Sequence, residues 1–219
     1  MKIAVTIACA LAVFAAATAS AQASFAGAYR LAGGPDVVGE LILKTDGRFQ
    51  YALAAGALDE QAEGRWVAAD GQVRLYTEPK PKPAVFSAGP QSTTKDGPLK
   101  VMVTWPNGDG IAGVDVTIGF ATDPTVTDYT QYYGWTMPPD EKRIPRWIEL
   151  VEPIHGIKSA RFAIDIGKGN ALTFVLTPND LGVVDFDGTV LERTGDRLVM
   201  HQRLGDLTFV RSQAAKNSN

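Results

Sequence analysis

The chain has 219 residues, with 21 lysines and arginines against 24 aspartates and glutamates, a formal net charge of −3 and 45% hydrophobic residues. This globular composition excludes an intrinsically disordered chain and a disulfide-stapled miniprotein, and the length allows one large or two small domains. Because the net charge is negative, the composition gives no sign of the excess of basic residues that nucleic-acid-binding proteins carry, and nucleic acid is not an expected partner.

Residues 1–23 have the pattern of a secretory signal peptide. Lys2 precedes an uncharged apolar run that ends at Ala17, and small residues follow. This order matches the charged, apolar and small-residue regions of such peptides. The apolar run is shorter than the about 20 residues needed to span a bilayer, so no transmembrane anchor is expected after cleavage behind Ala21 or Ala23. The predicted location is periplasmic or secreted, with a Gram-negative type of signal peptide.

Residues 24–77 predict an antiparallel β-meander. Asp-Gly pairs at 46–47 and 70–71 each separate two runs in which apolar and polar residues alternate. An Asp-Gly pair in that setting is the strongest short-range signal for a β-hairpin, because both turn positions favour positive φ. Two alternatives stay open for residues 54–63: a short helix or ordered loop, or a β-bulged continuation of the strands.

Residues 78–98 predict a linker that is rich in Pro, Gly and Ser. The stretch 78–83 alternates prolines with charged residues, which is typical of a stiff polyproline spacer. The residues from 87 onward hold little apolar content. This segment is the clearest domain boundary that the sequence offers.

Residues 99–156 begin with two expected strands, Leu99–Trp105 and Ile111–Phe120, around an Asn-Gly turn at 107–108. This hairpin resembles the opening of the transthyretin-like domains that occur beside carboxypeptidases and in many secreted bacterial proteins. The resemblance implies an Ig-type β-sandwich for the middle segment. It also implies a binding or spacer module without chemistry of its own.

Residues 157–212 predict further C-terminal strands, including a hairpin around 195–196, and residues 213–219 a flexible tail. A five-stranded meander alone would leave two edges unpaired, so the C-terminal strands can close a barrel with residues 24–77 around an inserted middle segment. Separate domains in series remain the alternative. The predicted fold class is all-β: an antiparallel meander or barrel plus an Ig/transthyretin-like β-sandwich.

The two segments that flank the middle region also resemble a lipocalin-like meander. The resemblance lies in Asp-Gly-Arg-Phe-x-Tyr at 46–51, Gly-Arg-Trp at 64–66 and Asp-Gly-x-Val-x-Leu at 70–75. It implies a closed or half-closed meander that holds an apolar ligand.

One segment gathers aromatic and basic residues between the expected strands of the middle region. Aromatic faces together with arginine can stack on sugars, proline-rich peptides or planar ligands. Alternatively, the aromatic rings close one end of the sandwich as part of its core. The predicted ligand-binding residues are Tyr129, Tyr132, Tyr133, Trp135, Arg146 and Trp147.

The sequence predicts no catalytic residue, no metal site and no cofactor. The imidazoles are those of His155, which lies in a turn close to two glutamates, and His201 on an expected strand. These two histidines and the nearby glutamates do not make up the three or four convergent ligands that a zinc site usually requires. The acidic turns at 107–110 and 185–188 lack the ligand spacing of a calcium loop and fit ordinary turn chemistry.

The expected function is that of an exported, non-catalytic binding module for a small ligand, a glycan or a partner protein of the bacterial envelope. One alternative is a structural or envelope-assembly protein whose edge strands pair with a partner. A second alternative is a hydrolase that uses carboxylates such as Asp165, Asp185 or Asp187.

Overall fold

The structure, a computed structural model, describes residues 24–94, 97–202 and 205–212. The predicted signal peptide, residues 1–23, and the predicted tail, residues 213–219, lie outside the described residues. The fold is 56% strand and 3% helix. The all-β class is therefore confirmed.

The chain divides into two compact units. The first, the barrel unit, combines the N-terminal part up to Pro81 with the C-terminal part from Gly182 onward. The second, the sandwich unit, is the continuous segment Lys82–Leu181. The sandwich unit is thus inserted, in sequence, between two parts of one barrel.

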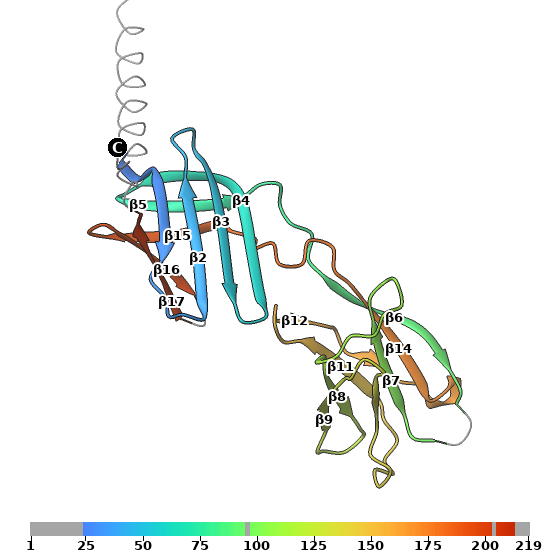
Figure 1. The fold of residues 1–219 in the computed structure, drawn as a ribbon. Coiled ribbons are helices and arrows are strands. Elements are labelled where there is room, and N and C mark those ends of the chain that lie inside the picture. Colours follow the sequence, from blue (N-terminus) through green and yellow to red (C-terminus); the bar gives the residue numbers. More distant parts are fainter. Residues whose placement is uncertain (1–23, 95–96, 203–204, 213–219) are drawn as a thin grey trace, which may run out of the picture. The chain divides into compact units, whose positions relative to one another are not determined.

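Eight antiparallel strands close the barrel in the order β1-β17-β16-β15-β5-β4-β3-β2. Figure 1 shows the five N-terminal strands in blue to cyan and the three C-terminal ones in orange to red. Closure gives every strand a partner on both sides, which removes the free edges of an open meander. The strands are β1 (Gly27–Leu31), β2 (Val37–Leu43), β3 (Arg48–Ala55), β4 (Leu58–Ala69), β5 (Gln72–Thr77), β15 (Asp187–Thr194), β16 (Arg197–Gln202) and β17 (Gly205–Arg211).

Turn residues explain the tight hairpins of the barrel. Asp70 and Gly71 both have positive φ, 54° and 74°, as a type I′ turn between β4 and β5 requires. Gly56, with φ of 59°, makes a similarly short turn between β3 and β4. The helix considered for residues 54–63 is therefore wrong, and these residues continue the two strands in regular register without a bulge.

Alternating side chains of the barrel strands point into a common core. In β3 and β5 every second residue is buried, which is the pattern of a strand with one face inside. Full burial of a large apolar side chain stabilises a fold by about 1.5–3 kcal/mol. The largest fully buried side chains of this core are Tyr29, Leu41, Leu43, Phe49, Trp66, Leu75, Leu191 and Phe209.

Two sheets form the sandwich unit. One has the order β10-β7-β14-β6, in which β14 and β7 run parallel, and the other has the order β12-β11-β8-β9 with β13 paired to β11. The strands are β6 (Val85–Ser92), β7 (Lys100–Thr104), β8 (Asp115–Gly119), β9 (Val126–Tyr129), β10 (Trp135–Thr136), β11 (Trp147–Glu152), β12 (Ile157–Lys158), β13 (Phe162–Ala163) and β14 (Ala171–Thr177).

The inner faces of both sheets share one apolar core. Val101, Val103 and Phe174 come from the first sheet, and Val116 and Ile148 come from the second. This is the two-layer arrangement of a β-sandwich. The likeness to transthyretin-like domains in particular stays a prediction.

The prediction that residues 78–98 form a linker is wrong for Val85–Ser92. These residues form strand β6, which pairs with β14. Only Val85 and Phe86 are large and apolar in this strand, so its sequence carries little alternation. Main-chain pairing to β14 forms the strand instead, and Gly89-Pro90 makes a bulge opposite Thr173.

The predicted C-terminal segment, residues 157–212, is divided between the two units. Strands β12, β13 and β14 belong to the sandwich, and only the strands from β15 onward belong to the barrel. Strands β13 and β14, which flank residues 167–170, do not form a hairpin with each other, because β13 pairs with β11 whereas β14 pairs with β6 and β7. The chain crosses from one sheet to the other through the 3-10 helix η1 (Ile166–Lys168).

Candidate functional site

Trp135 does not contribute to an exposed patch. Its side chain lies in the sandwich core with 7% exposure, and its Nε1 donates a 2.8 Å hydrogen bond to Oδ2 of Asp128. The other carboxylate oxygen, Oδ1, accepts a 2.9 Å hydrogen bond from the backbone N–H of Tyr129. The expectation that Trp135 faces a ligand is therefore wrong, and the alternative that aromatic rings belong to the core holds for this residue.

Tyr132 and Tyr133 are far more exposed, at 75% and 86%. They form the turn between Gln131 and Gly134, whose backbones exchange hydrogen bonds of 3.0 and 2.8 Å. The backbone carbonyl of Tyr132 packs closely on Gly110: a Cβ atom added to Gly110 would lie 1.9 Å from the carbonyl oxygen of Tyr132. The turn is thus fixed at its base while its two side chains project into solvent.

Tyr129 and Trp147 lie on the outer face of the sheet β12-β11-β8-β9. Along β11 the odd-numbered residues are partly exposed and the even-numbered ones are buried, so Trp147 points outward. Tyr129, which is 55% exposed, stands opposite Asp115 on the same face. Arg146 lies directly before β11, outside the strand, and is exposed. Because Trp135 is buried, the six predicted residues do not form one patch.

The indole of Trp147 is sandwiched between a glycine and an arginine. Gly119 is its partner on β8, and a Cβ on Gly119 would lie 1.8 Å from the indole Cε2, so the ring covers the bare glycine backbone. The guanidinium of Arg161 lies 4.0 Å from the ring centroid. Arg161 and Lys158 both approach Glu149, with N–O distances of 3.7 and 3.0 Å.

A row of polar side chains crosses this outer face. Thr127 on β9 is paired with Thr117 on β8, and Thr117 is paired with Glu149 on β11. Arg161 continues the row beyond β11 through its approach to Glu149. Because adjacent strands are about 4.8 Å apart, the row presents hydrogen-bonding groups at regular intervals.

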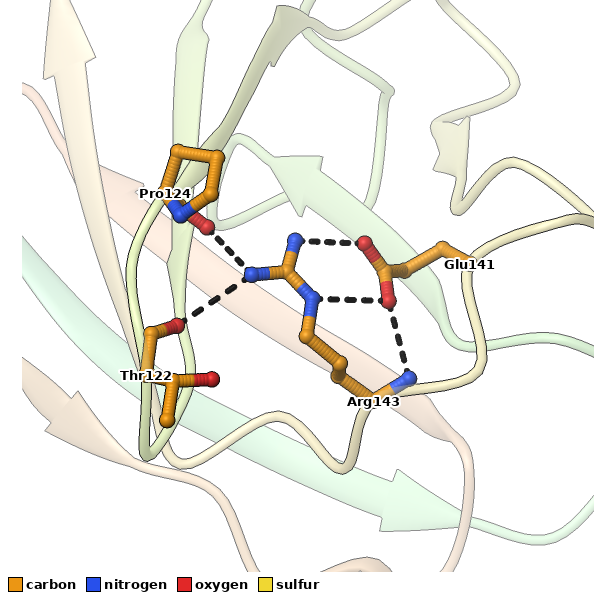
Figure 2. Close-up of polar contacts among 4 residues, drawn as sticks. All are labelled: Thr122, Pro124, Glu141 and Arg143. Carbon is orange, nitrogen blue, oxygen red and sulfur yellow. Dashed lines mark hydrogen bonds and ion pairs between the residues drawn. The ribbon is translucent and has the colours of Figure 1, made fainter.

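Arg143 forms a clamp between two loops of the sandwich unit, as Figure 2 shows. Its Nε and Nη2 donate to the two oxygens of Glu141 at 3.0 and 2.6 Å, and its Nη1 donates to the carbonyls of Thr122 and Pro124 at 3.2 and 2.6 Å. The guanidinium also stacks 4.0 Å over Phe120. These hydrogen bonds lower the pKa of Glu141 from 4.5 to about 2. With its donors engaged in this way, Arg143 has a structural role.

The two histidines lie in different places: His155 in the turn after β11 and His201 on the outer surface of the barrel. Nδ1 of His155 lies 3.1 Å from Oε2 of Glu152, and this carboxylate also accepts the backbone N–H of Ile154 and of His155. Glu152 therefore caps the turn after β11. Nδ1 of His201 lies 2.8 Å from Oδ1 of Asp206 on the outer surface of the barrel, and that hydrogen bond raises the pKa of His201.

The barrel interior is packed around Phe186. This residue precedes β15 and is 2% exposed, and its ring centroid lies 5.1 Å from that of Tyr51 and 6.0 Å from that of Phe49. The hydroxyl of Thr77 donates to the carbonyl of Val184 and accepts the N–H of Phe186, which fixes the segment that enters the barrel. The lipocalin-like resemblance implied an apolar ligand at this place, where Phe186 packs against the rings of Tyr51 and Phe49.

The sandwich unit has a small cavity of about 130 Å³ next to Pro90, Phe162 and Phe174. Ligand pockets are typically about 300–1,000 Å³, so this cavity fits a group of only a few atoms. The amide of Gln91 at its wall donates to the backbone carbonyls of Asp165 and Gly169. We therefore assign no ligand to it.

Among the described residues, no group of three or more His, Cys, Asp or Glu side chains could hold a metal ion. In the same part of the chain, no helix is both long and apolar enough to cross a membrane. Comparison of the chain with protein-family models, curated proteins and solved structures found no match.

Sequence reasoning missed the residues that surround Trp147. Glu149 is one of the two glutamates close to His155 in the sequence, Thr117 and Gly119 lie in the expected strand Ile111–Phe120, and no sequence motif singles out Lys158 or Arg161. Period-two alternation along 147–152 would have placed Trp147 and Glu149 on one face. The pairing of Gly119 with Trp147 and the approach of Arg161 depend on contacts between strands, which the sequence does not reveal.

Proposed function

We propose that the protein is an exported, non-catalytic binding module that docks on a partner protein of the bacterial envelope through the Tyr132–Tyr133 turn. The observation that carries this proposal is the exposure of both tyrosines, 75% and 86%, on a turn whose base is hydrogen-bonded. Export itself rests on the predicted signal peptide, residues 1–23, which lies outside the described residues.

Tyrosine suits such a contact for physical reasons. Its ring supplies apolar area and its hydroxyl a hydrogen bond, and few rotatable bonds are frozen on binding. Tyrosine is accordingly enriched among the residues that dominate binding energy at protein interfaces. The fixed turn between Gln131 and Gly134 further lowers the entropy cost of docking.

Two features of the sandwich oppose the alternative of edge pairing with a partner strand. On β9, the Asp128 carboxylate accepts a hydrogen bond from the backbone N–H of Tyr129 and another from the indole N–H of Trp135. On β6, Pro90 lacks an N–H and the bulge at Gly89-Pro90 interrupts the ladder. Both are devices that protect edge strands from pairing with other chains.

Site-specific photo-cross-linking in the native host tests the proposal. A photoreactive amino acid is placed at Tyr133 and, as a matched control, at Ile144, which is 62% exposed in the same unit. We expect a discrete protein adduct from position 133 that position 144 does not give, identified by mass spectrometry.

The identified partner is then purified and titrated against the full processed chain. The double variant Tyr132→Ser/Tyr133→Ser should bind at least about tenfold more weakly than wild type, as expected for tyrosines that anchor an interface. Equal affinity of wild type and double variant, or identical adducts from positions 133 and 144, would refute the proposal.

A further inference from the structure

Arg161 differs from the other arginines that stack on aromatic rings. In the described residues, guanidinium groups lie over the rings of Phe25, Tyr29, Tyr76, Phe120 and Trp147. The arginines on the first four rings each donate side-chain hydrogen bonds. Arg161, which stacks on Trp147, donates none within the described part of the chain, and its side chain is 62% exposed. Its donors are therefore available to a ligand.

The stack holds this guanidinium in a defined plane. One face of Trp147 lies on the bare backbone of Gly119, and Arg161 covers the other at 4.0 Å. The closest approach of Arg161 to Glu149 is through Nε, at 3.7 Å, which is too long for a hydrogen bond. Nη1 and Nη2 keep their donors in the planar fork that matches a carboxylate.

The charges at this corner of the sheet do not balance. Lys158 and Arg161, both more than 60% exposed, share the single carboxylate of Glu149. The two cations outnumber Glu149 at this corner, while Asp115, which stands across β11 from Lys158, adds a second carboxylate to the face. Charge complementarity favours an anion here.

Hydroxyl and carboxylate groups extend from this corner across the sheet. Glu149, Thr117 and Thr127 stand in register on β11, β8 and β9. The carboxylate of Glu149 can accept hydrogen bonds from a hydroxyl-rich ligand that lies along the row, and the two threonine hydroxyls can donate or accept them. Tyr129, 55% exposed on the same face, offers a ring at the far side.

We propose that the outer face of the sheet β12-β11-β8-β9 binds an acidic oligosaccharide. A uronic acid carboxylate forms a bidentate pair with Nη1 and Nη2 of Arg161 and is attracted by Lys158. The hydroxyls of adjoining sugar residues hydrogen-bond with Glu149, Thr117 and Thr127. This site is separate from the Tyr132–Tyr133 turn and does not depend on the proposed protein partner.

Calorimetric titration of the full processed chain with trigalacturonate tests this proposal. We expect saturable binding with a dissociation constant of about 1 mM or tighter. Arg161→Gln should weaken it about tenfold to hundredfold, and Arg161→Lys should restore only part of the affinity because it keeps the charge but loses the fork. Arg30→Gln, the same charge change at an exposed barrel position, should leave binding unchanged.

Comparison ligands identify the chemistry that is recognised. Neutral galactotriose, sodium acetate and triglutamate should each bind at least about tenfold more weakly than trigalacturonate at equal ionic strength. Absence of saturable binding by trigalacturonate overturns the proposal, as does equal binding by Arg161→Gln. Equal affinity for acetate or triglutamate overturns it too, because the sugar would then contribute nothing. The Tyr132→Ser/Tyr133→Ser variant should bind trigalacturonate normally, so the two proposals fail independently.

Discussion

The carboxylate of Asp128 joins the edge strands of both sheets of the sandwich unit through Trp135. Asp128 lies on β9 and is paired with Val116, and Trp135 lies on β10 and is paired with Val101. The 2.8 Å hydrogen bond from the indole Nε1 to Oδ2 connects these two edges, while Oδ1 accepts the N–H of Tyr129. One side chain thus satisfies a buried donor and blocks an open strand edge.

Asp128→Ala should therefore have two effects. The N–H of the buried indole loses its acceptor, which costs about 1–3 kcal/mol of unfolding free energy. The freed N–H on β9 also becomes available to another chain, so we expect concentration-dependent association. Urea denaturation and sedimentation velocity measure the two effects separately. Asp128→Asn keeps one acceptor oxygen in place of two, so it can retain only one of the two hydrogen bonds and should lie between wild type and the Ala variant. An Ala variant as stable and monomeric as wild type would contradict the role of Asp128.

Gly119→Ala should disrupt the stack on Trp147. The new Cβ would lie 1.8 Å from the indole Cε2, so the ring has to move and Arg161 loses its platform. Such overpacking typically costs about 1–3 kcal/mol. Thermal unfolding measures the cost, and the tryptophan emission spectrum reports the displacement of the ring. Gly97→Ala in the same unit, where a Cβ meets nothing within 4 Å, should leave both measurements unchanged.

Local signals in the sequence predicted the barrel hairpins. The pair at Asp70-Gly71 determines its turn because both residues adopt positive φ, and the alternating strands beside it bury every second side chain. Strand β6 could not be predicted in this way. Apart from Val85 and Phe86 its residues are small or polar, and it is a strand because β14 offers main-chain partners far away in sequence.

The environment of the candidate site residues could not be predicted from the sequence either. The aromatic segment was evident from the sequence, but Tyr132, Trp135 and Trp147 occupy three different environments: a projecting turn, a buried core position and a stack on Gly119. Composition identifies such residues without revealing which of them a fold buries. Arg161 was missed because its significance depends on Trp147, which is fourteen residues earlier in the chain and diagonal to it across the sheet.

The Arg143 clamp should weaken in acid. Hydrogen bonds from Arg143 lower the pKa of Glu141 from 4.5 to about 2 in the folded protein. The stabilisation is therefore fully present above pH 4.5 and is lost as the pH falls toward about 2. We expect the difference in melting temperature between wild type and Glu141→Gln to shrink over this interval. A difference that stays constant from pH 5 to pH 2 would show that Glu141 contributes nothing through its charge.

His201 should give the barrel the opposite pH dependence. The hydrogen bond to Asp206 raises the pKa of the imidazole above 6.5, so its stabilisation is fully present below pH 6.5 and is lost as the pH rises through the raised value. An NMR titration of the imidazole C–H signals measures this pKa directly, with the His155 signal identified by a His155→Gln variant. Asp206→Asn should lower the pKa of His201; an unchanged titration curve would exclude Asp206 as the cause.

Phe186 should be among the residues on which the barrel depends most. It is 2% exposed between Tyr51 and Phe49, so Phe186→Ala should cost about 3–5 kcal/mol of unfolding free energy. Val38→Ala, at a position 63% exposed, should change stability by less than about 0.5 kcal/mol.

The same variant tests whether the interior is filled. Removal of the ring leaves an apolar cavity, and such cavities take up benzene-sized ligands. Benzene should therefore raise the melting temperature of Phe186→Ala and leave that of wild type unchanged. If benzene stabilised wild type and variant equally, the wild-type interior would already hold space for an apolar ligand. The ligand implied by the lipocalin-like resemblance would then return as a candidate, because the rings of Phe186, Tyr51 and Phe49 would not fill the barrel after all.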